Sequence, residues 1–154
     1  MATQYTAGLT SGQVLTAATM NSIGAAWETY TPSFTNATVG NGTVSAAYTQ
    51  INKLVVGRVS FTLGSTSAVS NYVVVTVPIA AKVATYGGTV TYHDASPKAV
   101  YQGFFDPSST TSGIVIGVLN SAGTYVVGGG MSSTVPFTWT TSDQILLNFY
   151  YEAA

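Results

Sequence analysis

The chain has 154 residues, enough for one domain with a sizeable hydrophobic core. Only 6% of its residues are charged, against about 25% in ordinary globular proteins. Four basic and five acidic residues give a formal net charge of −1, so no cationic surface is available and we expect no direct binding to nucleic acid. Cysteine is absent, which excludes disulfides and thiolate metal sites.

The first 28 residues are predicted to form a loose arm followed by one short helix. The stretch LTAATMNSIGAAWE places Met20, Ile23 and Trp27 at spacings of three and four, which gives one apolar helix face behind a Thr16 N-cap. A helix this short is marginal alone, so the face must pack against something. Two alternatives stay open: it lies on the sheet of its own domain, or it anchors the chain to another subunit.

Two features of the chain bear on its location. The start, MATQYTAGLTSGQ, lacks the basic and apolar regions of a secretory signal, so we expect synthesis and assembly in a cytoplasm. The longest apolar run, YVVVTVPIAA at 72–81, is too short to cross a bilayer, which needs about 20 residues. We therefore expect no membrane partner.

From residue 29 to residue 154 the pattern predicts an all-β domain. Asn41-Gly42 and Asn52-Lys53 supply turn residues for tight hairpins. Turn-forming clusters separate the other candidate strands. The predicted strands are residues 43–51, 54–63, 72–77, 83–93, 99–105, 113–119, 124–129 and 144–151. About eight short strands rich in Thr, Val, Tyr and Gly are typical of an antiparallel β-sandwich of jelly-roll type.

Few residues offer chemistry. His93 is the one histidine and stands beside Asp94 at a strand end, but no serine lies in a recognisable nucleophile setting, so a surface polar pair is the better interpretation. Asp94, Asp106 and Asp143 are scattered over predicted turns. Glycosidase chemistry would require two carboxylates placed as a pair. No acids cluster as metal ligands, and Gly128-Gly129-Gly130 lacks the context of a phosphate loop. We predict no enzyme activity and no cofactor.

The low charge points to association instead. A surface carried by Ser, Thr and Asn with nearly zero net charge favours contact with other proteins. Ten Tyr and two Trp add to this, because tyrosine is enriched at interfaces. The alternative is that most of these rings form cross-strand pairs inside the domain.

Several segments together resemble the small structural proteins of tailed bacteriophages. These are SGQVLTAATMNSIGAAWETYTPSF, TVGNGTVSAAYTQINKLVVGRVSFTLGSTS, VVVTVPIA and PFTWTTSDQILLNFYYE. In that group a GQVLTAA-type helix and a W-x-x-YTP entry precede a Gly-rich β-domain that often ends in Tyr-Glu. One departure is Ala46-Ala47-Tyr48, where such domains commonly have Gly-Arg-Tyr, so no role of that Gly-Arg pair is transferred.

The resemblance implies a virion location and two alternative functions. The favoured one is a homotrimeric capsid decoration or minor capsid protein, whose partners are copies of itself and the major capsid protein or other virion proteins. Residues 1–28, with Met20, Ile23 and Trp27, would attach it. The alternative is a minor tail or tail-fibre protein whose β-domain binds a receptor or host surface glycan, with Tyr101, Phe104 and Phe105 as candidate recognition residues. The absence of a shaft such as a coiled coil favours decoration.

Overall fold

The computed structural model describes residue 14 and residues 26–154, and every element in this part of the chain is a β-strand. Met20, Ile23 and most of the predicted helix lie outside the described residues. The strands are β1 (Glu28–Thr29), β2 (Phe34–Thr38), β3 (Thr43–Ile51), β4 (Leu54–Thr62), β5 (Ala68–Thr76), β6 (Gly87–Asp94), β7 (Ala99–Phe105), β8 (Gly113–Asn120), β9 (Val127–Gly129) and β10 (Gln144–Glu152). The prediction of an all-β domain is confirmed.

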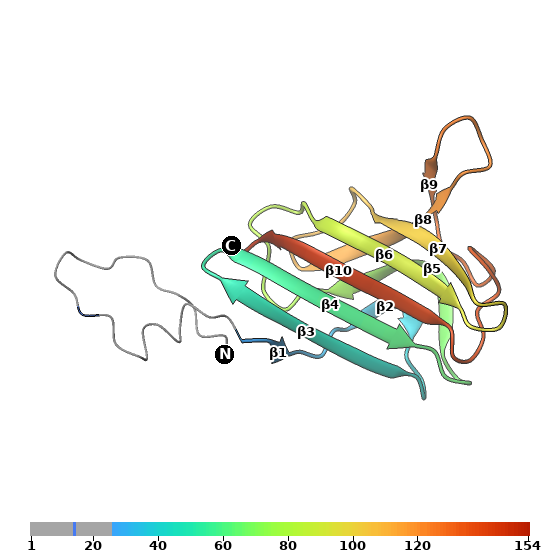
Figure 1. The fold of residues 1–154 in the computed structure, drawn as a ribbon, viewed down its shortest axis with the longest axis horizontal. Coiled ribbons are helices and arrows are strands. Elements are labelled where there is room, and N and C mark those ends of the chain that lie inside the picture. Colours follow the sequence, from blue (N-terminus) through green and yellow to red (C-terminus); the bar gives the residue numbers. More distant parts are fainter. Residues whose placement is uncertain (1–13, 15–25) are drawn as a thin grey trace.

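All strand pairs are antiparallel and join into one sheet. The order is β1-β3-β4-β10-β6-β7-β8-β5-β2, with β9 paired to β8. Figure 1 shows the sheet curling on itself, with β3, β4, β10 and β6 nearest the viewer and β2 and β5 behind. The predicted two-sheet sandwich is not confirmed, because β7 and β8 continue the hydrogen-bonded path from β6 round to β5.

The core fills the inside of this curl. In β10, Ile145, Leu147, Phe149 and Tyr151 are buried, while the residues between them face outward. The same alternation runs through β4, and each large apolar side chain buried in this way contributes about 1.5–3 kcal/mol. Residues 113–118 of β8 are buried without alternation, as expected for a strand covered on both faces.

A row of four aromatic rings belongs to this interior. Phe137 lies between Tyr101, at 5.1 Å between ring centroids, and Trp139, at 4.5 Å. Trp139 in turn meets Tyr92 edge-on at 5.9 Å, and its indole N–H donates to the carbonyl of Ser132 at 3.0 Å. The segment between β9 and β10 is thereby attached to the sheet, and many of the aromatic residues form pairs inside the domain.

Some predicted strand limits are wrong, for reasons outside the local sequence. β5 begins at Ala68 instead of residue 72, because residues 68–69 pair with Ala37 and Thr38 of the unpredicted strand β2. β6 begins at Gly87 instead of residue 83. The Asn41-Gly42 turn is centred one residue earlier, since Gly40 has the positive φ of 55° and the Gly42 N–H donates to the Val39 carbonyl. The Asn52-Lys53 connection of β3 and β4 is confirmed.

Candidate functional site

The residues considered for catalysis do not form a site. His93 lies on the outer face of β6 opposite Gln144, and the adjacent Asp94 is the last residue of that strand. Among the described residues, no three His, Cys, Asp or Glu side chains gather where they could hold a metal ion. No helix in the described part of the chain is long and apolar enough to cross a membrane.

Asp143 is fully buried and serves the local fold. One carboxylate oxygen accepts the Ala95 N–H at 2.9 Å, and the other accepts the Thr140 N–H at 2.5 Å and the Thr140 hydroxyl at 3.1 Å. These bonds compensate for removing the charge from water and connect the turn before β10 with the end of β6. Asp143 is therefore a structural carboxylate.

Trp27 lies outside the core, at the start of β1. Its side chain is 52% exposed, and the Arg58 guanidinium carbon lies 5.2 Å from the ring centroid. Arg58 belongs to the outward-facing residues of β4. The indole therefore rests on the outer face of the sheet. Whether Met20 and Ile23 share an apolar face with Trp27 stays a prediction.

The three aromatic residues predicted for recognition are divided between the two faces of β7. Tyr101 and Phe105 point toward the core and pack against it. Phe104 points the opposite way, and its ring occupies the space that side chains would fill at Gly117 and Gly128. The structure does not bring the three rings together, and a recognition role for them stays a prediction.

Phe104 marks the base of a hairpin that projects from the body of the domain. We call residues 119–128, which join β8 to β9, the projecting hairpin (Figure 1). All ten residues are exposed and none is charged. Tyr125 is 80% exposed and Val126 is 62% exposed, with Leu119 and Val127 nearby in the same hairpin. It is thus an apolar, uncharged extension.

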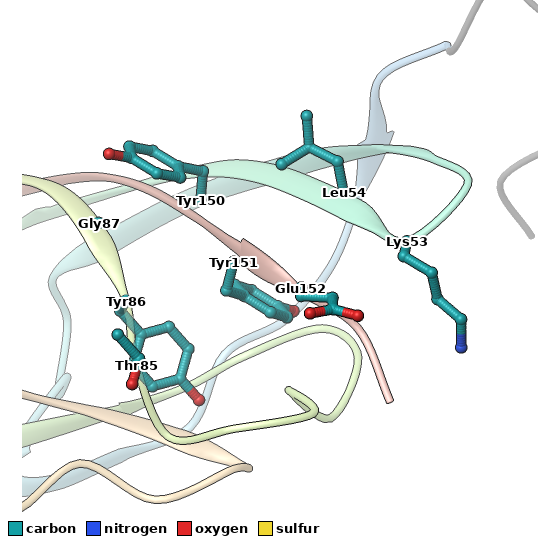
Figure 2. Close-up of a pocket in the computed structure, with 8 residues that line it drawn as sticks. All are labelled: Lys53, Leu54, Thr85, Tyr86, Gly87, Tyr150, Tyr151 and Glu152. Carbon is teal, nitrogen blue, oxygen red and sulfur yellow. The ribbon is translucent and has the colours of Figure 1, made fainter.

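A second feature is an open pocket of about 530 Å³ where β10 ends and β6 begins, which we call the β10 pocket (Figure 2). The strand alternation turns Tyr150 outward between buried Phe149 and Tyr151. Figure 2 shows Tyr150 and Leu54 on one side of the sheet end and the rings of Tyr86 and Tyr151 on the other. The lining residues are Lys53, Leu54, Thr85, Tyr86, Gly87, Tyr150, Tyr151 and Glu152.

Two of the pocket tyrosines are fixed by the protein. The Tyr86 hydroxyl donates to the Thr110 carbonyl at 2.6 Å, and the Tyr151 hydroxyl donates to the Ile79 carbonyl at 2.6 Å. Their rings meet edge-on at 5.2 Å. Burial raises the pKa of both phenols, so they stay neutral at ordinary pH and act as walls.

Few signs of either feature are present in the sequence. The β10 pocket is assembled from residues 53–54, 85–87 and 150–152, which only the strand register brings together. One signal was available: in the run Phe149-Tyr150-Tyr151, alternation requires the middle ring to face away from the core. The Gly128-Gly129-Gly130 run has a steric reason, because Gly128 and Gly130 make room for the rings of Phe104 and Tyr72.

Comparison with known proteins adds no assignment. The chain matches no protein-family profile, no curated protein and no solved structure.

Proposed function

We propose that this chain is a non-enzymatic structural protein of a tailed-bacteriophage particle, assembled in the host cytoplasm as a homotrimer. In this proposal it is a capsid decoration or minor capsid protein that contacts the major capsid protein or other virion proteins through residues 1–28. The sequence resemblance motivates this class. The exposed Trp27, at the boundary between that segment and the domain, is consistent with such an attachment.

The projecting hairpin is the observation that carries the proposal. Valine and tyrosine side chains exposed to this extent on a hairpin without charges leave apolar area in water, and burying it against a neighbouring subunit is favourable. A cyclic trimer offers such a contact, because the hairpin of one subunit meets a different patch on the next. The low overall charge reduces the electrostatic cost of bringing copies together.

The jelly-roll-like sandwich is a finer part of the same proposal. The two halves of the curled sheet face each other across one core, which is the packing relationship between the two sheets of a sandwich. On this view β7 and β8 are the place where the two layers are joined by continuous strand pairing.

Two matched variants test the assembly. Val126→Asp places a charge in the projecting hairpin, whereas Val83→Asp places the same charge at a valine of equal exposure, 62%, in the segment before β6. Sedimentation should give a trimer mass for the unchanged chain and Val83→Asp, and a mass near 15.9 kDa for Val126→Asp. Equal masses for the two variants would contradict the hairpin contact. A monomeric native chain, with isolated monomers on particles, would overturn the trimer itself.

The second candidate function is a minor tail or tail-fibre protein with a receptor- or glycan-binding domain. The feature that favours it is the β10 pocket, whose volume falls within the range of about 300–1,000 Å³ that is usual for small-molecule sites. A decoration protein has no need for an open pocket of this kind.

A further inference from the structure

We propose that the β10 pocket binds a pyranose sugar, with the ring of Tyr150 as the stacking surface. This deepens the second candidate function and, in biological terms, rests on it, but the binding itself is a property of the folded chain alone. The proposal places the recognition site at the start of β4, the start of β6 and the end of β10. This site is separate from Tyr101, Phe104 and Phe105 and from the projecting hairpin. Four observations support it.

The first observation is that the Tyr150 ring is both exposed and held in place. Tyr150 is the register partner of Gly87 on β6. A Cβ atom at Gly87 would collide with the Tyr150 ring, so the ring lies across the glycine backbone. The side chain is nevertheless 55% exposed. An aromatic surface is thus fixed beside the pocket with much of its area open to a ligand.

The second observation is the apolar side chain beside this ring. Leu54 is exposed on the same side of the sheet end as Tyr150, whereas the rings of Tyr86 and Tyr151 lie on the other side (Figure 2). Tyr150 and Leu54 therefore form the apolar surface offered to the ligand, and Tyr86 and Tyr151, whose hydroxyls donate to backbone carbonyls, support the sheet end from the other side. The C–H faces of a pyranose match this kind of surface.

The third observation is a set of polar groups at the rim. Lys82 holds one carboxylate oxygen of Glu152 at 2.6 Å, which leaves the other oxygen able to accept hydrogen bonds. The Lys53 ammonium donates to the Ala154 carbonyl and has further protons to donate. The hydroxyls of Thr85 and Tyr150 make no hydrogen bond to the described part of the protein. A ligand with several hydroxyls around an apolar face is complementary to this arrangement.

The fourth observation is the charge balance. Glu152 and Lys82 form an ion pair, and Lys53 is the one further charged residue in the pocket lining. A phosphate or nucleotide site would require several cationic or backbone N–H donors directed at one point, which this rim lacks. A sugar requires both hydrogen-bond donors and acceptors, without a strong electrostatic field of one sign.

The test uses the purified full chain and three named probes: methyl β-glucoside, methyl β-galactoside and methyl β-glucuronide. Saturation-transfer NMR at millimolar sugar should detect binding of at least one. The glucoside and glucuronide differ by a carboxylate, so stronger binding of the glucuronide would assign a role to Lys53, and equal binding would assign the recognition to the ring and the hydroxyls. Both results support the site.

Three variants locate the binding. Tyr150→Ala should weaken it by at least about tenfold, whereas Tyr125→Ala, which removes the most exposed ring of the projecting hairpin, should leave it unchanged. Gly87→Ala keeps every lining side chain but displaces the Tyr150 ring, and it should weaken binding as well. Circular dichroism and melting temperature check that each variant is folded.

The outcomes separate this inference from the particle proposal. No binding of any of the three sugars, or binding that survives both Tyr150→Ala and Gly87→Ala, overturns the sugar site. Neither result affects the oligomeric mass of the Val126→Asp variant, on which the assembly proposal depends. Conversely, a monomeric chain that binds a glycoside through Tyr150 would retain the site and remove the trimer.

Discussion

The indole of Trp27 rests on the guanidinium group of Arg58, 5.2 Å from its carbon, on the outer face of the sheet. The relationship distinguishes Trp27 from Trp139, the other tryptophan, which packs between Tyr92 and Phe137 inside the curl. One tryptophan therefore belongs to the surface and one to the core.

This difference predicts losses of stability of different size when the two indoles are removed. Trp27→Ala should lower the free energy of unfolding by about 0.5–1 kcal/mol, the value of an exposed cation–π contact. Trp139→Ala should lower it by about 3 kcal/mol or more, because it leaves a cavity and removes the hydrogen bond from the indole N–H to the Ser132 carbonyl. Urea denaturation followed by circular dichroism measures both. A large loss of stability in Trp27→Ala would instead make Trp27 a plug of the domain.

The same Trp27 variant tests the proposed attachment. If residues 1–28 attach the chain to the particle, Trp27→Ala and a chain lacking residues 1–26 should both fold but bind poorly to particles that lack the native protein. Co-sedimentation with such particles gives the answer. A truncated chain that still decorates them would contradict attachment through this segment.

A second prediction concerns Asp143, whose two oxygens accept three hydrogen bonds. Asp143→Asn should cost about 1–3 kcal/mol, because an amide presents one oxygen and leaves either the Ala95 or the Thr140 N–H facing an NH2 group. Asp143→Ala should cost more. Asp94→Asn is the matched control, and a change within about 0.5 kcal/mol is expected there. Equal stability of the two Asn variants would show that the buried carboxylate has no structural role.

Local pattern predicted most of the sheet. β3 and β7 were placed at their correct limits, because alternation and flanking turn residues such as Asn52 define both ends. β2 was missed because its two half-buried positions, Phe34 and Ala37, are separated by a bulge at Asn36, which has a positive φ of 62°. Its strand character comes from pairing with β5, whose partner residues lie about thirty to forty positions away in the sequence, and not from a local period.

The candidate site was less accessible to prediction. The sequence indicated an aromatic surface but named Tyr101, Phe104 and Phe105, which are consecutive or nearly so along one strand and therefore alternate between faces. The β10 pocket depends on the register that sets Tyr150 opposite Gly87. A one-residue slip would turn Tyr150 inward, so the site could not be read before the pairing was known.

A third prediction concerns alkaline pH. Burial raises the pKa of Tyr30, Tyr92 and Tyr151 well above the ordinary value of 10.0. Because these phenols lose their protons more easily in the unfolded chain, their contribution to stability is complete below pH 10 and is lost as the pH rises above it. The urea midpoint should therefore be nearly constant from about pH 7 to 9 and fall steadily beyond about pH 10.

Tyr92→Phe is the variant that checks this dependence. It removes one titrating group and also the hydrogen bond from the Tyr92 hydroxyl to the Gly117 carbonyl at 2.8 Å. The variant should be less stable at pH 7 by about 1 kcal/mol but show a shallower decline above pH 10. A decline as steep as that of the unchanged chain would mean that Tyr92 does not contribute.

The last prediction concerns the base of the projecting hairpin. The Phe104 ring fills the space beside Gly117 on β8 and Gly128 on β9, so it joins three strands where the hairpin leaves the domain. Phe104→Ala removes this contact and leaves two glycines uncovered, which should loosen the short β8–β9 pairing without opening the core. Hydrogen exchange followed by mass spectrometry should become faster in residues 118–129 and stay unchanged in β10. Val100→Ala, an exposed outward residue on the same strand, is the control.

If the hairpin makes the trimer contact, Phe104→Ala should also weaken the trimer, because disorder in the hairpin adds an entropic cost to assembly. Unchanged exchange in the hairpin would show that Phe104 is free for another role, such as the recognition predicted for it from the sequence.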